Sequence, residues 1–206
     1  MFICRRIIMN KLIIALLYLI TVFNIPASFG GDKDGRYAIR GAGLLSCKTF
    51  LAERSKKSPA YMMIGGWLDG YITAYNKLQQ DTFDVSPYAS TELLSVVIGQ
   101  HCKDNPDDLL GPVLGGILAR LNKDRLDAAS PFVTVKVGDY ETSLYARTIQ
   151  EIQTRLSRKG LFKGSASGNW DDETTAAIAR YQKEIGYTAS GYPDQKTLWY
   201  LFRSKE

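Results

Sequence analysis

The sequence of 206 residues predicts an all-α protein with two helical parts joined by a linker. Apolar residues recur at helical spacing over seven stretches, and capping residues precede several of them. Only residues 132–137 alternate like a β-strand. We expect a signal peptide over residues 1–30, a four-helix domain stapled by a disulfide over 31–125, a linker over 126–143, and a three-helix module over 144–206.

The first thirty residues are typical of an export signal. Arg5, Arg6 and Lys11 precede an apolar run over residues 12–25, and the small residues Ser28 and Gly30 suit cleavage after Gly30. The run is ~14 residues, against ~20 for a spanning helix, which disfavours the alternative of an uncleaved membrane anchor. Translation from Met9 instead of Met1 would leave a complete signal. We expect a periplasmic or extracellular protein with no stable membrane insertion after cleavage.

The charge of the chain gives little support to nucleic-acid binding. The formal net charge of +5 falls to +2 without the signal, which carries three basic residues and no acid. Residues 31–130 hold twelve basic and twelve acidic side chains, and residues 145–206 hold ten and seven. Since no strongly basic domain remains, we expect no nucleic-acid partner.

Cysteine usage predicts one disulfide bond. The signal removes Cys4, so the mature protein keeps Cys47 and Cys102, an even pair in an oxidising compartment. A bridge across this separation would contribute about 4 kcal/mol on the chain-entropy account. The alternative is a pair of inert buried thiols.

Four helices are predicted ahead of the linker, over residues 39–54, 58–80, 90–103 and 107–121. Ser58-Pro59 starts the second helix and Asn105-Pro106 separates the third from the fourth. Gly65, Gly66 and Gly70 interrupt the second helix at a cost of ~1 kcal/mol each. They allow either a close approach of a neighbouring helix or a groove that admits the backbone of a partner.

Residues 123–144 change pattern, and we interpret them as a linker with one short extended segment. Residues 132–137 alternate with β-type side chains, and Gly138-Asp139 turns the chain.

Three more helices are predicted over residues 144–159, 171–185 and 193–202. Gly160 suits the end of the first. The acids Asp171, Asp172 and Glu173 suit the start of the second, where the helix dipole favours negative charge. Pro193-Asp194 starts the third.

The residues of these three helices carry a family pattern. It comprises Ile152-Gln153 and Leu156, Gly160, Phe162, Gly164, Gly168-Asn169-Trp170, Thr174, Ala177-Ile178, Tyr181-Gln182, Gly186, Gly191, Asp194, Thr197-Leu198 and Leu201. This part of the chain resembles the peptidoglycan-binding domain found beside cell-wall amidases, transglycosylases and carboxypeptidases. It departs from the family at Ser165-Ala166-Ser167, where an Asp is usual ahead of Gly168, and at Tyr181, where Phe is commoner.

The resemblance implies that the module binds peptidoglycan at a shallow site. Aromatic rings, backbone donors and cations suit sugar faces, amides and carboxylates, and a polymeric ligand makes weak single-site affinity sufficient. We expect Tyr181 to lie in the core, and Gln153 and Gln182 to hydrogen-bond loop backbone. Trp170 has the alternative of a packed loop residue. The candidate ligand-binding residues are Trp170, Arg155, Lys163, Arg180, Tyr187 and Tyr192.

The residue inventory argues against catalysis and against a metal or other cofactor. His101 is the only histidine, so the several ligands of a zinc peptidase site are not available. No serine has an evident base, because that base would have to be His101, which we expect at a helix end, partly exposed. A single carboxylate such as Glu53 or Glu92 would suffice for a transglycosylase, but a small stapled domain leaves little room for a sugar cleft.

Cys47, residues 66–71 and Cys102 make the first domain similar to small periplasmic helical proteins, which include immunity proteins of type VI secretion and, more distantly, acid-stress chaperones. That similarity implies a protein-binding role. We expect a non-catalytic exported protein that binds peptidoglycan and presents a helical protein-interaction domain. The alternatives are an immunity or chaperone-like protein that binds a periplasmic partner such as a wall hydrolase, and an accessory part of a cell-wall hydrolase.

Overall fold

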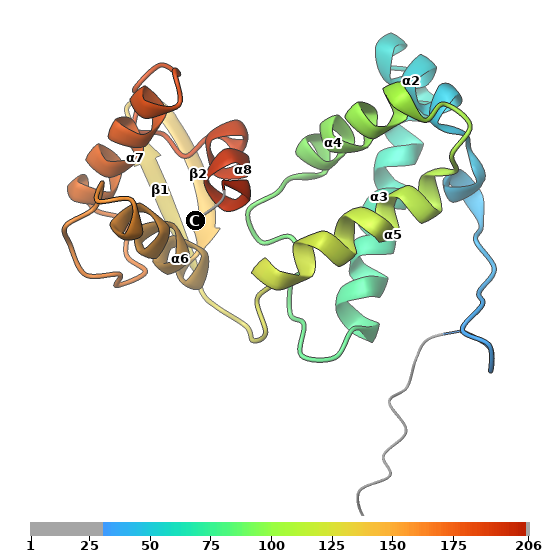
Figure 1. Cartoon of the computed structure of the whole chain (residues 1–206), viewed down its shortest axis with the longest axis horizontal. Helices are drawn as coiled ribbons and strands as arrows, with labels where there is room; N and C mark the ends of the chain where they lie inside the picture. The colour runs from blue at the N-terminus through green and yellow to red at the C-terminus, as the bar shows by residue number, and fades with distance from the viewer. Residues whose placement is uncertain (1–30, 205–206) are drawn as a thin grey trace, which may run out of the picture. The chain divides into compact units, whose positions relative to one another are not determined.

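The computed structural model describes residues 31–204, and within these, residues 39–204 belong to one compact unit. The signal peptide predicted over residues 1–30 lies outside the described residues. The elements in chain order are η1 (Gly41–Leu44), α2 (Cys47–Lys56), α3 (Pro59–Leu78), α4 (Thr91–Asp104), α5 (Leu110–Leu121), η2 (Asn122–Asp124), β1 (Phe132–Val137), β2 (Tyr140–Tyr145), α6 (Ala146–Arg158), α7 (Asp172–Glu184) and α8 (Gln195–Arg203) (Figure 1).

Serine hydroxyls begin three of the first four α-helices. Ser46, Ser58 and Ser90 each accept a hydrogen bond from the backbone N–H three residues on, which satisfies a donor that the helix leaves unpaired. The Ser46 cap also divides the first predicted helix, over residues 39–54, into η1 and α2. An extended Ser46 places a break where apolar spacing alone predicts a continuous helix.

The predicted disulfide between Cys47 and Cys102 is confirmed, with the two Cα atoms 4.8 Å apart. It joins the first residue of α2 to the last turn of α4, and both cysteines are fully buried. Backbone hydrogen bonds from Cys47 N to Asp108 O and from Leu110 N to Leu45 O tie the start of α5 to the same place. The bridge therefore lies where the ends of three helices meet.

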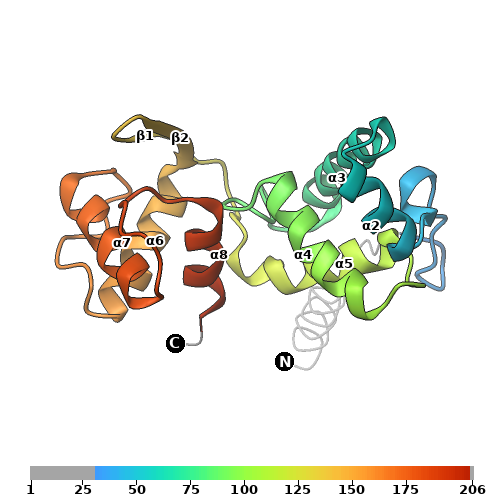
Figure 2. The ribbon, with the colours of Figure 1, turned by 90° about the horizontal axis from the view of Figure 1, so that it is seen from above.

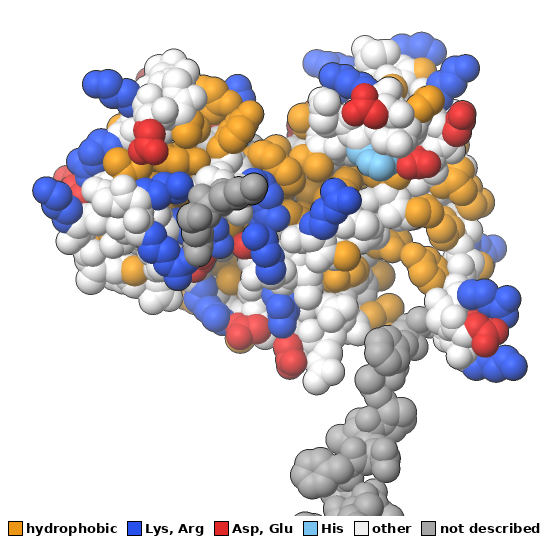
Figure 3. Space-filling model, viewed as in Figure 1, with side chains coloured by type: hydrophobic (Ala, Val, Ile, Leu, Met, Phe, Trp, Pro, Cys, Tyr) orange, Lys and Arg blue, Asp and Glu red, His pale blue; other side chains and the backbone are white. Residues whose placement is uncertain are grey.

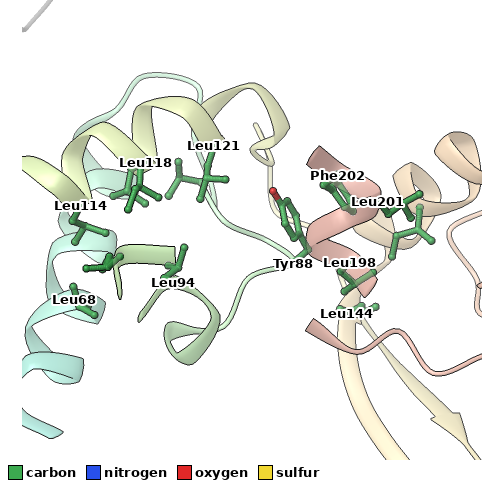
Figure 4. Close-up of a cluster of buried hydrophobic side chains, with 14 of the residues drawn as sticks. Leu68, Tyr88, Leu94, Leu114, Leu118, Leu121, Leu144, Leu198, Leu201 and Phe202 are labelled. Carbon is green, nitrogen blue, oxygen red and sulfur yellow. The ribbon is translucent and has the colours of Figure 1, made fainter. Parts of the chain in front are cut away.

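Leucines form the interior of the amino-terminal helical segment, by which we mean residues 39–126. Leu68 of α3, Leu94 of α4, and Leu114 and Leu118 of α5 are all fully buried and lie in the cluster of Figure 4. α5 buries seven of its twelve residues, which matches its nearly unbroken apolar sequence. Burial of these side chains is the main non-covalent stabilisation of the segment.

The predicted linker over residues 126–143 contains a β-hairpin, so the expectation of a single extended segment was wrong. β1 and β2 pair antiparallel from Phe132 opposite Tyr145 to Val137 opposite Tyr140. The second strand escaped prediction because its sequence is mainly polar and buries only Leu144. The protein is accordingly mostly helical with one small two-stranded sheet among the described residues, which broadly agrees with the predicted all-α class.

No neighbouring helix packs closely against the glycines of α3, so the expectation that they allow a close helix approach was wrong. A Cβ at Gly65, Gly66 or Gly70 would meet no atom within 4 Å. Close approach occurs instead at Gly43, where a Cβ would lie 2.4 Å from the ring of Trp67. The glycines therefore leave part of the solvent-exposed surface of α3 without side chains, and the exposed Met62 and Met63 lie one turn before them.

Charged and aromatic contacts link the amino-terminal helical segment to the helices that follow the hairpin. The Asp124 carboxylate, 2% exposed, pairs with Arg155 of α6 at 3.0 Å and with Arg203 of α8. Tyr88 stacks on Phe202 of α8 with ring centroids 3.9 Å apart, as Figure 4 shows. Over residues 31–204, no helix combines the length and apolar character needed to cross a membrane.

Candidate functional site

The carboxy-terminal module consists of α6, α7 and α8 packed around one apolar core (Figure 2). α6 contributes Ile149, Ile152 and Leu156, and the other two helices contribute Ala177, Ile178, Tyr181, Leu198, Leu201 and Phe202. Tyr181 is 2% exposed, which confirms its predicted place in the core. The three helices were predicted to within two residues at their starts and to within one residue at their ends.

A buried glutamine holds the long loop between α6 and α7. Gln153 is fully buried; its Oε1 accepts from Gly168 N at 3.0 Å, and its Nε2 donates to Asn169 O at 2.8 Å and to Thr174 Oγ1 at 2.9 Å. Gly168 has φ of 78°, and a Cβ there would lie 2.7 Å from Ala146 O, so only glycine fits. One side chain thus fixes the loop backbone against two helices.

A second glutamine repeats the arrangement between α7 and α8. Gln182 is 1% exposed; its Oε1 accepts from Gly191 N at 2.8 Å, and its Nε2 donates to Tyr192 O at 2.9 Å and to Thr197 Oγ1 at 3.1 Å. The expectation that Gln153 and Gln182 hydrogen-bond loop backbone is confirmed.

Aspartates cap the helices that follow these two loops. Asp171 accepts from the backbone N–H of Thr174, and Asp194 accepts from that of Thr197. Each also accepts from the hydroxyl of the same threonine. Because the threonine hydroxyl in turn accepts from the buried glutamine, the capping aspartate, the threonine and the glutamine form one polar network at each loop.

Trp170, Arg180 and Arg155, three of the six candidate ligand-binding residues, make polar contacts that hold loops and helices of the protein. The Trp170 indole N–H donates to Thr175 Oγ1 at 2.9 Å. Arg180 binds the Leu161 carbonyl at 2.8 Å and the Glu173 carboxylate at 2.7 Å. Arg155 is 13% exposed and pairs with Asp124 and Glu151. These contacts fix loops and helices in place.

The other three candidates are more accessible. Lys163 is exposed on the loop between α6 and α7, and its backbone N–H points to the Glu173 carboxylate that Arg180 binds. Tyr187 and Tyr192 are half-buried in the short turn between α7 and α8. By their contacts, the six residues belong to three neighbourhoods: the long loop, the short turn, and Arg155 beside Asp124.

The short turn lies beside aromatic and basic residues that sequence reasoning did not select. Tyr187 packs edge-on against Tyr200, with ring centroids 5.7 Å apart, and Lys196 Nζ lies 3.9 Å from the centre of the Tyr187 ring. A hydrogen bond from Lys196 lowers the pKa of Tyr187 and raises the pKa of the lysine itself. Helical spacing in α8 places Lys196 and Tyr200 on one face, which is the signal that could have found them.

A cationic hollow opens between α6 and α8. It has a volume of about 210 Å³ and is lined by Arg155, Arg158, Lys159, Leu201 and Ser204. In the view of Figure 3, several Lys and Arg side chains lie on the surface of the carboxy-terminal module.

His101 occupies the place that the sequence predicts, at the end of α4 with 38% of its side chain exposed. Its Nε2 lies 2.8 Å from an Asp108 carboxylate oxygen. Within residues 31–204, no three His, Cys, Asp or Glu side chains gather as a metal site would require.

The module corresponds to a known family. Residues 146–200 match the family described as "Putative peptidoglycan binding domain". The similarity of the amino-terminal part to immunity proteins and chaperones finds no support in the comparisons with known proteins. No curated protein and no solved structure matches the chain.

Proposed function

We propose that this is an exported, non-catalytic protein that binds peptidoglycan through its carboxy-terminal module. The observation that carries the proposal is the family match over residues 146–200, together with the two glutamine-held loops on which the matched residues lie. Fixed loops offer a pre-organised surface, which reduces the entropic cost of binding.

The accessible residues of the module fit the chemistry of the polymer. Lys163 and Lys196 are exposed cations suited to the carboxylates of stem peptides. Tyr187, Tyr192 and Tyr200 offer rings to sugar faces and hydroxyls to amides. Each contact is weak, and the repetition of sites along the cell wall raises the overall avidity.

Export is supported by the disulfide and by the signal pattern of the first thirty residues. The bridge between Cys47 and Cys102 persists in an oxidising compartment such as the periplasm. The cell wall lies in the same compartment, so location and proposed ligand agree.

The proposal is tested by sedimenting the full-length protein with purified sacculi. We expect saturable binding that soluble peptidoglycan fragments reverse. A Lys163→Glu, Lys196→Glu variant should bind more weakly, because both changes oppose the stem carboxylates. A Lys77→Glu, Lys103→Glu variant carries the same change of charge on α3 and α4 and should bind like the wild type. Sedimentation no greater than that of an unrelated basic protein would refute the proposal.

The proposal excludes catalysis on the cell wall, including an accessory role within a hydrolase. Incubation of the protein with sacculi and with purified muropeptides should release no new product by chromatography. Any product that requires the folded protein would overturn this part of the proposal.

A second role, protein binding, is favoured by the outer face of α3. Met62 and Met63 are 72% and 74% exposed, and Gly66 and Gly70 leave open space beside them. Large flexible apolar side chains next to a smooth backbone suit an apolar helix of a protein partner. A photo-crosslinker at Met63 should capture a defined partner that then binds the purified protein, whereas one at Val96, exposed on α4, should not. Equal capture at both positions would contradict this role.

A further inference from the structure

The β-hairpin lies outside the residues that match the family, yet it is built onto the module. β2 ends at Tyr145 and α6 begins at Ala146, so no linker separates them. Val135 and Leu144 are 0% and 5% exposed and belong to the same apolar core as the module helices. Figures 1 and 2 both show the two strands lying against the module. The hairpin is therefore a fixed addition to the module surface.

Tyr140 stands at the tip of the hairpin, on the face that packs on the module. It pairs with Val137, and the alternation of side chains places it on the same face as Val135 and Leu144. Those two are buried, whereas Tyr140 remains 65% exposed. Packing of the hairpin thus leaves most of this large ring in solvent.

Tyr140 meets an aromatic residue of the matched module. Its ring lies 5.4 Å from that of Tyr192, with the planes inclined by 36°. The Tyr192 hydroxyl donates to Glu141 O at 3.3 Å, which ties the short turn to the hairpin tip. The Gln182 side-chain amide also donates a hydrogen bond to the Tyr192 carbonyl oxygen, which restricts the backbone of this turn. Two rings from separate elements are therefore held side by side.

We propose that Tyr140 and Tyr192 form a platform that stacks on sugar rings of the glycan strand, so that the hairpin extends the binding surface beyond the matched module. This inference rests on the proposed function. Sugar rings present apolar C–H faces to aromatic rings and hydroxyls to phenols, which tyrosine satisfies together.

The charges around the platform select the glycan over the stem peptide. Tyr140 lies between Asp139 and Glu141, both exposed. Two acids oppose the carboxylates of stem peptides but leave a neutral sugar face unaffected. Stem carboxylates fit the exposed cations elsewhere on the module better, such as Lys163.

The hairpin provides its own control for a test in the full-length protein. Tyr140→Ala should weaken binding to purified sacculi about three- to ten-fold, the effect of one aromatic contact. Tyr140→Phe keeps the ring and should stay within about two-fold of the wild type. Phe132→Ala removes a ring of equal exposure, 64%, from the opposite face of the same hairpin and should leave affinity unchanged.

Competition identifies the ligand. Glycan strands stripped of stem peptides by an amidase should displace the wild type from sacculi, and should displace Tyr140→Ala less effectively. Equal affinities of Tyr140→Ala and Phe132→Ala, in a wild type that binds, would overturn the platform and leave the proposed function standing. Displacement by free stem peptides alone would also overturn it. Failure of the wild type to bind would instead overturn the proposed function, and the platform with it.

Discussion

The amino-terminal helical segment and the carboxy-terminal module are stabilised in different ways. The segment combines a buried disulfide with an interior of leucines. The module has no cysteine, and two buried glutamines, 0% and 1% exposed, fasten its loops through polar networks. The first solution constrains the unfolded chain, and the second satisfies buried polar groups in the folded one.

This difference explains why the sequence of the module matches a protein family and that of the segment does not. A polar network needs particular residues at particular positions, so Gln153, Gly168, Asp171 and Thr174 form a recognisable pattern. A leucine interior accepts many sequences of similar volume. The pattern of the module therefore matches a family, whereas that of the segment does not.

The largest effect should come from the covalent bridge. The double variant Cys47→Ala, Cys102→Ala should lose about 4 kcal/mol of unfolding free energy in denaturant titration, because the unfolded chain regains the freedom of a long loop. Reductant should lower the stability of the wild type and leave the variant unchanged. If the wild type and the double variant unfold at the same denaturant midpoint, the disulfide does not stabilise the segment.

The next largest effect should come from the buried Asp124 carboxylate between the segment and the module. Asp124→Asn leaves Arg155 and Arg203 without their shared carboxylate and should cost about 3 kcal/mol, as measured by thermal unfolding. Asp127→Asn is the control, since its pair with Arg147 is exposed to solvent and should affect stability little. Equal effects of the two substitutions would show that the ion pairs of Asp124 do not stabilise the contact between the segment and the module.

The polar network of the module can be broken without changing volume. Gln182→Leu should cost about 2 kcal/mol because it leaves the buried Gly191 N–H without its acceptor and removes a donor to the Thr197 hydroxyl. Gln150→Leu on the exposed side of α6 should change the unfolding free energy little. Denaturant titration of both variants gives the comparison, and a neutral Gln182→Leu would mean that apolar packing alone holds the module.

The smallest effect concerns Trp170. Trp170→Phe removes the hydrogen bond to Thr175 and should cost about 1 kcal/mol in thermal unfolding. If the substitution leaves stability intact but abolishes sacculus binding, the indole serves the ligand and not the loop.

Much of the helical fold follows from sequence because caps and apolar spacing act locally. Ser58, Ser90 and Asp171 begin their helices where their side chains predict. β2 could not be predicted, since its polar residues acquire a strand only by pairing with β1. The contact between Tyr140 and Tyr192 depends on that pairing, and the partners of Arg155 and Arg180 lie far from them in sequence, so these contacts could not be predicted.

Hydrogen–deuterium exchange of the full-length protein, with and without soluble peptidoglycan fragments, tests the central claim most directly. We predict slower exchange in the turn over residues 186–194 and at the hairpin tip over residues 137–141, with α3 unchanged. Unaltered exchange throughout residues 137–200 at saturating fragment, or protection confined to α3, would contradict peptidoglycan binding by the module.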